Sequence, residues 1–160
     1  MPGSPSPVRS RVTGSVITRL RTSLGLPGMA VLQFGFDAAH PESVHNLENV
    51  TEDRIAYTGT HDNDTLRGWY ESIPAALRAR VDAARPGDEE PWWELIALLF
   101  ATPARVAMVQ AQDVLGLGSE ARMNQPGTAS GAWKWRMTAL PSADAARRLR
   151  AATEAAGRLP

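Results

Sequence analysis

Residues 58–65 hold the densest group of side chains in this sequence that could do chemistry. The segment reads TGTHDNDT and directly follows a short apolar stretch. A carboxylate here could accept hydrogen bonds from sugar hydroxyls or face a developing positive charge, and a histidine could donate to either partner. Alternatively, the polar residues only form a tight strand-to-helix turn and cap the helix. Asp64 and Thr65 are the better caps, and His61 with Asp62 is the better functional pair.

A second candidate is the glycine-rich segment of residues 112–131, which contains Glu120, Arg122 and Asn124. Its Gly-x-Gly is only weak support for phosphate binding, because no Lys-Ser/Thr pair follows it. The alternative is a structural loop in which Glu120 and Arg122 contact each other. Without further information, we favour that alternative.

Tryptophans and histidines form the third group of candidates. Trp133 and Trp135 could stack on sugar rings or pack in the core, and the sequence leaves both options open, whereas Trp92 and Trp93 open a strongly apolar helix and favour the core. The three histidines lack a helical metal-ligand spacing. We therefore expect neither a metal nor a cofactor.

Composition excludes several classes of function. The 160 residues correspond to about one domain, and 17 basic against 17 acidic side chains give no electrostatic footprint for nucleic acid or a polybasic membrane surface. The absence of cysteine excludes disulfides, a thiol nucleophile and cysteine-ligated zinc. The longest apolar run, residues 95–101, is too short to span a bilayer. We expect no nucleic-acid or membrane partner and a cytoplasmic location.

The elements that must position these residues follow from the hydrophobic pattern. Short apolar stretches bounded by turn residues are typical of parallel strands buried on both faces. We expect strands at residues 29–36, 55–58 and 106–111. Helical spacing and Pro/Gly boundaries predict helices at residues 16–24, 66–72, 74–84, 91–102 and 143–156. The alternation indicates an α/β fold of βα units on a parallel sheet. Loops at residues 34–46, 60–65 and 112–131 should then open at the same sheet edge.

Several of these segments, in the same order, resemble the C-terminal portion of the 4-α-glucanotransferases (amylomaltases or disproportionating enzymes). The matching stretches are LGLPGM at 24–29, VLQF at 31–34, YTGTHDNDT at 57–65 and QDVLGLGSEARMN at 112–124. The resemblance covers roughly residues 14–137. It implies the C-terminal part of a (β/α)8 TIM barrel, with about three βα units and long loops at the C-terminal ends of the strands. On this basis residues 14–160 form a partial barrel, and the Pro/Ser/Gly-rich residues 1–13 form a disordered or artefactual leader.

The resemblance also implies an activity and roles for four residues. The family transfers a segment of an α-1,4-glucan to the 4-hydroxyl of an acceptor sugar by a retaining mechanism, which needs two carboxyls about 5 Å apart. Asp62 matches the aspartate that stabilises the transition state. His61 and Asn124 match substrate-contacting positions, and Phe34 matches an aromatic residue on the acceptor side.

The same comparison of motifs shows two departures from the family pattern. The family's nucleophile belongs to a strand ahead of this chain's first residue, and Arg11 occupies the position of the acid/base glutamate. We therefore expect the chain to be inactive alone, with α-1,4-glucans, maltooligosaccharides and the missing N-terminal half of the barrel as its candidate partners. The alternatives are a non-catalytic glucan-binding or partner-completing module, and a truncated reading frame without an independent role.

Overall fold

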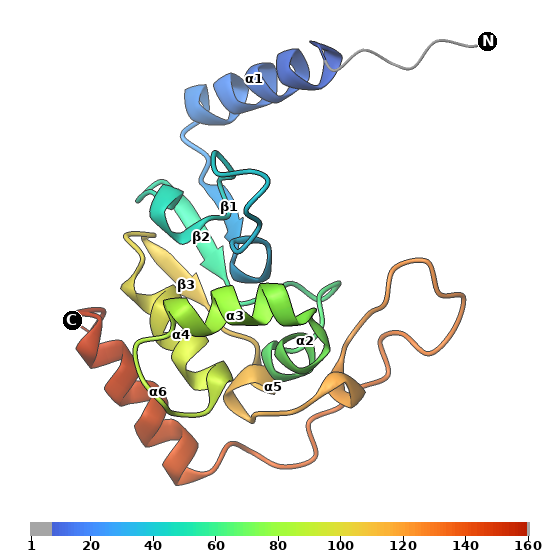
Figure 1. Cartoon of the computed structure of the whole chain (residues 1–160), viewed down its shortest axis with the longest axis vertical. Coiled ribbons are helices and arrows are strands. Elements are labelled where there is room, and N and C mark those ends of the chain that lie inside the picture. Colours follow the sequence, from blue (N-terminus) through green and yellow to red (C-terminus); the bar gives the residue numbers. More distant parts are fainter. Residues whose placement is uncertain (1–7, 160) are drawn as a thin grey trace.

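Three short parallel strands form the centre of the computed structural model, which describes residues 8–159, with side chains from residue 16 onward. The sheet order is β1 (Gly28–Val31), β2 (Arg54–Tyr57) and β3 (Val106–Met108), with β2 in the middle (Figure 1). All pairings are parallel. The expected parallel sheet of successive βα units is confirmed.

The helices surround this sheet unevenly. Their bounds are α1 (Val8–Ser23), α2 (Leu66–Ser72), α3 (Ala75–Ala84), α4 (Pro91–Ala101), α5 (Ala111–Val114) and α6 (Ala143–Ala155). Helix α4 packs against α2 and α6, whereas α1 extends away from the body of the molecule (Figure 1). No helix in the described part of the chain is both long and apolar enough to cross a membrane.

The hydrophobic core lies between α4 and one face of the sheet. Leu95, Ile96 and Leu99 of α4 are at most 1% exposed, and they belong to the same buried cluster as Ala30 of β1 and Ala56 of β2. Alternate residues of a strand point to opposite faces. These small alanines share a face, because Ala30 pairs with Ala56 in the β1–β2 register. Small side chains on this face leave room for the larger residues of the helix.

The opposite face of the sheet is largely open. Met29, Val106 and Met108 lie on this face and are 44–49% exposed, whereas Val31 on the same face is 1% exposed. The expectation that the strands would be buried on both faces therefore holds at Val31 and is wrong at Met29, Val106 and Met108.

Several element boundaries differ from the sequence prediction for local reasons. The first strand ends at Val31, because the chain turns into a 3₁₀ helix, Leu32–Phe34, that Gly35 closes by donating its N–H to the Leu32 carbonyl at 2.8 Å. The third strand ends at Met108, and the expected loop after it contains α5 and a 3₁₀ helix, Ser119–Ala121.

The first helix begins at Val8 rather than at residue 16. No proline follows Pro7 within this stretch, so the helix can continue toward the N-terminus. Residues 8–13 of the expected leader thus lie in α1, and its first seven residues lie outside the described part. That residues 1–13 are a disordered or artefactual leader stays a prediction.

Candidate functional site

The loop between β2 and α2 is held by its own side chains, and the Asp62 carboxylate is not one of the groups that close its turn. Asn63 Oδ1 accepts hydrogen bonds from the Thr60 N–H at 2.9 Å and from the Thr60 hydroxyl at 2.8 Å. Thr65 is the N-cap of α2, and its side chain accepts from the Gly68 N–H at 3.0 Å. The predicted cap at Thr65 is confirmed, and the turn is closed without the Asp62 carboxylate.

Asp64 is a structural residue in this loop. Its Oδ1 accepts from the Thr65 N–H at 2.8 Å, and its Oδ2 accepts from the Ser119 hydroxyl at 2.7 Å. Its backbone carbonyl accepts from the amide of Gln33 at 2.7 Å. Asp64 therefore ties the loop after β2 to the segments that follow β1 and β3.

Asp62 lies beside two of the residues that the sequence singled out with it. The Asn124 amide donates to Asp62 Oδ1 at 2.5 Å, and His61 Nε2 lies 3.4 Å from the same oxygen. The Asp62 and His61 side chains are about half exposed, at 46% and 56%. The structure thus brings a carboxylate, an imidazole and an amide together on the solvent side of the sheet edge.

Arg122 joins the two loops that carry these groups. Its Nη2 donates to the Asp62 carbonyl at 2.7 Å, and its Nε donates to the Asn124 carbonyl at 2.8 Å. The Asn124 N–H in turn donates to the His61 carbonyl at 3.0 Å. The expected contact between Glu120 and Arg122 is wrong, because Glu120 Oε1 accepts instead from the Gly118 N–H two residues away. The sequence placed Arg122 in a candidate segment but gave no sign of its partner 60 residues away.

Phe34 lies on the same hollow as Asp62. This hollow has a volume of about 580 Å³, and both residues line it together with Arg122. Phe34 is 51% exposed, and the ring of His45 packs edge-on against it with the ring centres 5.5 Å apart. Burial, assisted by the charge of Arg54, lowers the pKa of His45, which fits its role as acceptor of the Val31 N–H at 3.1 Å. All three segments that follow the strands therefore contribute to one region, as the sequence predicted.

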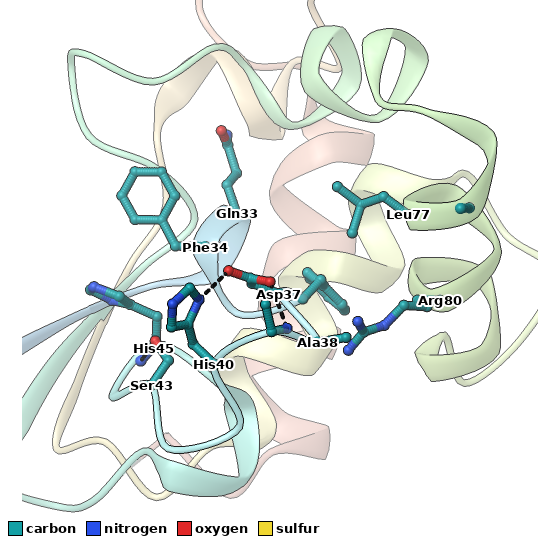
Figure 2. A pocket seen from close by; sticks show the side chains of 12 residues that line it. Gln33, Phe34, Asp37, Ala38, His40, Ser43, His45, Leu77 and Arg80 are labelled. Atoms are coloured by element: carbon teal, nitrogen blue, oxygen red, sulfur yellow. Dashed lines mark hydrogen bonds and ion pairs between the residues drawn. The ribbon is translucent and has the colours of Figure 1, made fainter.

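A larger hollow of about 870 Å³ adjoins Phe34 between the loop after β1 and helix α3 (Figure 2). Asp37 accepts hydrogen bonds there from His40 at 2.7 Å and from the Ala39 N–H at 2.8 Å. The hydrogen bond with His40 lowers the pKa of Asp37, and the same contact raises the pKa of His40. Leu77 and Arg80 of α3 line the other side. The sequence placed Asp37 and His40 in the candidate loop at residues 34–46 without giving either a role, and it gave no sign that Leu77 and Arg80 would face them.

Asp113 is a buried carboxylate beneath the candidate site that the sequence analysis also missed. It is 1% exposed, and its two oxygens accept from the Thr58 hydroxyl at 2.6 Å and from the Leu66 N–H at 2.7 Å. Burial raises the pKa of Asp113 to about 6. Because Thr58 and Leu66 stand at the two ends of the loop that carries Asp62, one carboxylate fixes both ends.

Two of the tryptophans lie in or against the core, and a third is exposed beside His61. Trp93 is 8% exposed and belongs to the core cluster, as expected. Trp92 is only partly buried and packs against this cluster, and the Arg67 guanidinium lies 5.3 Å from its ring centre. Trp133 is 53% exposed, and its ring centre lies 5.0 Å from that of His61.

Among the described residues, no group of three or more His, Cys, Asp or Glu side chains is arranged to hold a metal ion. The groups that do lie together at this edge of the sheet are a carboxylate, an imidazole, an amide and an aromatic ring. Such a set suits a neutral polyol, whose hydroxyls need donors and acceptors and whose ring carbons need an apolar surface.

The chain is similar in sequence to 4-alpha-glucanotransferases. A family model described as 4-alpha-glucanotransferase matches residues 12–142. The chain is 46% identical over 157 residues to a 4-alpha-glucanotransferase of Thermus thermophilus, covering 89% of this chain and 30% of that protein. It is 44% identical over 132 residues to the chloroplastic/amyloplastic 4-alpha-glucanotransferase of Solanum tuberosum, covering 80% and 22%.

A solved structure matches the fold as well as the sequence. It is an amylomaltase from Streptococcus agalactiae in complex with acarbose, superposed with a TM-score of 0.82 at 29% identity, covering 99% of this chain and 31% of that one. The chain thus spans between about a fifth and a third of the length of these relatives. Its sheet and helices form part of a (β/α)8 barrel, and the chain belongs to the 4-alpha-glucanotransferase family.

Proposed function

We propose that this chain supplies a glucan-binding part of a 4-alpha-glucanotransferase active site. In the whole enzyme, a segment of an α-1,4-glucan would be transferred to the 4-hydroxyl of an acceptor sugar with retention of configuration. The observation that carries the proposal is the convergence of His61, Asp62 and Asn124 beside the hollow that Phe34 lines. The amylomaltase of similar fold binds acarbose, which supports a sugar-like ligand here as well.

Each residue has a distinct role in this proposal. The half-exposed carboxylate of Asp62 accepts hydrogen bonds from sugar hydroxyls and opposes the positive charge of an oxocarbenium-like transition state. The Asn124 amide fixes the orientation of that carboxylate, and His61 donates to the same sugar unit. Phe34 offers an apolar ring to the acceptor sugar.

The chain alone should bind glucan without transferring it. A retaining mechanism needs a nucleophile and an acid/base carboxyl about 5 Å apart. Two carboxylates, Asp62 and Asp64, line the hollow of about 580 Å³. Both oxygens of Asp64 are engaged, by Thr65 and by Ser119. Asp62 is then the single carboxylate of this hollow that is open to substrate, which is too few for the reaction.

Calorimetric titration with maltoheptaose tests the binding proposal. Asp62→Asn should weaken affinity about tenfold, because it removes a charged acceptor from the sugar hydroxyls. Asp88→Asn, in the turn between α3 and α4, is the matched control and should bind like the unmodified chain. Equal affinity in all three proteins would contradict the role of Asp62.

An assay for glucose release from maltotriose tests the expected lack of transfer. No release should be seen with the purified chain, and release that Asp62→Asn abolishes would show that the chain is catalytically complete. Cytoplasmic location stays a prediction from the sequence.

A second candidate function, a module that completes a partner, is favoured by the open face of the sheet. Met29, Val106 and Met108 are large, apolar and about half exposed. Mixing the chain with the Thermus thermophilus relative from which the matching 30% has been removed would test it. Recovery of disproportionation only in the mixture would support this candidate, and an inactive mixture without association would count against it.

A further inference from the structure

Trp133 has a backbone conformation that a bulky residue rarely adopts. Its φ is +63°, in the left-handed region. In the described part of the chain, every other residue with a positive φ is a glycine. The contact between Cβ and the following carbonyl oxygen makes this region unfavourable for side chains other than glycine. Two hydrogen bonds hold the residue there. The Trp133 N–H donates to the Met123 carbonyl at 2.6 Å, and the Arg136 guanidinium donates to the Trp133 carbonyl at 3.0 Å.

The strained backbone places the indole of Trp133 against His61. The two ring centres are 5.0 Å apart, with their planes inclined by 38°. The Asn124 N–H fixes the backbone of His61 through its carbonyl, and the indole contacts its ring. His61 Nε2 lies 3.4 Å from Asp62 Oδ1 in this arrangement. More than half of the His61 side chain is exposed, and the Trp133 indole and the Asp62 carboxylate are the groups beside its ring.

Packing of the fold does not account for the strain. Trp133 is 53% exposed, whereas Trp93 in the core is 8% exposed. Trp133 neither belongs to the core cluster nor packs against it, and its ring contact is with His61. Backbone strain at a residue outside the core is typical of residues that serve a site.

We propose that Trp133 is a positioning residue, whose strained backbone holds the His61 imidazole beside the Asp62 carboxylate for sugar recognition. The inference rests on the proposed glucan binding at this site. It predicts that affinity depends on an aromatic ring at position 133. Of the two variants without a ring, the glycine variant should be more stable than the alanine variant, because glycine has no Cβ. A merely structural tryptophan would make affinity and stability change together.

Three substitutions of the full chain separate these effects, with maltoheptaose affinity measured by calorimetry and stability by thermal unfolding. Trp133→Phe keeps a ring and should bind within about twofold of the unmodified chain. Trp133→Ala and Trp133→Gly should each bind about fivefold to tenfold more weakly. Trp133→Gly should nevertheless unfold at a higher temperature than Trp133→Ala, because glycine adopts this φ without strain. Trp92→Phe, outside the hollow, is the control and should leave affinity unchanged.

The ring protons of His61 give a readout that needs no ligand. In proton NMR spectra they should be shifted by the indole in the unmodified chain and in Trp92→Phe, and should lose that shift in Trp133→Gly. Unmodified affinity in Trp133→Gly, or affinity that rises with stability from Trp133→Ala to Trp133→Gly, would overturn the inference alone. An unmodified chain that does not bind maltoheptaose would overturn the proposed function and this inference with it.

Discussion

Two layers of hydrogen bonds lie at the C-terminal edge of the sheet, and they differ in their access to water. In the lower layer, Asp113 is 1% exposed and binds Thr58 and Leu66. In the upper layer, Asp62 is half exposed and is touched by Asn124 and His61. The lower carboxylate uses both oxygens for the protein, whereas the upper carboxylate keeps capacity for a ligand. The buried layer therefore fixes the two ends of the loop, and the exposed layer is where the proposed glucan would bind.

The largest effect should come from removing the buried carboxylate. Asp113→Ala leaves the Thr58 hydroxyl and the Leu66 N–H buried without their acceptors, which should lower the free energy of unfolding at pH 4 by about 2–3 kcal/mol. Urea unfolding measures this loss. Asp88→Ala serves as the control, and a loss of similar size there, or none in Asp113→Ala, would contradict the structural role of the lower layer.

The pH dependence of stability should also identify the lower layer. The pKa of Asp113 is raised to about 6 in the fold from an ordinary value of 3.8, so the folded state binds the proton more tightly than the unfolded state. The contribution of Asp113 is therefore most favourable below pH 4 and is lost as pH rises through 6, by about 2–3 kcal/mol in all.

The difference in urea stability between the unmodified chain and Asp113→Asn isolates this contribution from the other carboxylates. That difference should change between pH 4 and 7 and stay constant above pH 7. A constant difference over the whole range would show that Asp113 titrates normally.

Removing the Arg122 side chain from the upper layer should have a smaller effect on stability and a clear effect on binding. Arg122→Ala removes the donors to the Asp62 and Asn124 carbonyls. We expect a loss of about 1 kcal/mol in unfolding free energy and a loss of about fivefold to tenfold in maltoheptaose affinity. Arg122→Lys should not restore affinity, because an ammonium lacks the planar fork that reaches two carbonyls. Recovery in the lysine variant would mean that charge, rather than geometry, is what matters.

The local parts of this structure were accessible from the sequence. The apolar stretches and turn residues predicted the parallel sheet, and the polar residues Asp64 and Thr65 before the expected helix predicted its cap. The motif around His61 and Asp62 was found because its residues are neighbours in the chain. The resemblance to a family added Phe34 and Asn124, which local patterns could not have joined to that motif.

The parts that were missed depend on contacts between distant residues or on backbone geometry. Thr58 and Asp113 are 55 residues apart, and Arg122 lies 60 residues from Asp62, so no periodicity relates them. The early end of β1 depends on the turn that Gly35 closes. The positive φ of Trp133 goes with a hydrogen bond from its N–H to the Met123 carbonyl and one from Arg136 to the Trp133 carbonyl, and its residue type gives no sign of it.

The separation of the two loops along the chain also bears on the order of folding. The contact between Asn124 and Asp62 closes a span of 62 residues, and the loop that carries Asn124 follows β3. Closing so long a span costs chain entropy that only later contacts repay. The upper layer should therefore form after β3 has joined β2. The proposed sugar site would then be completed late in folding, on a sheet that is already assembled.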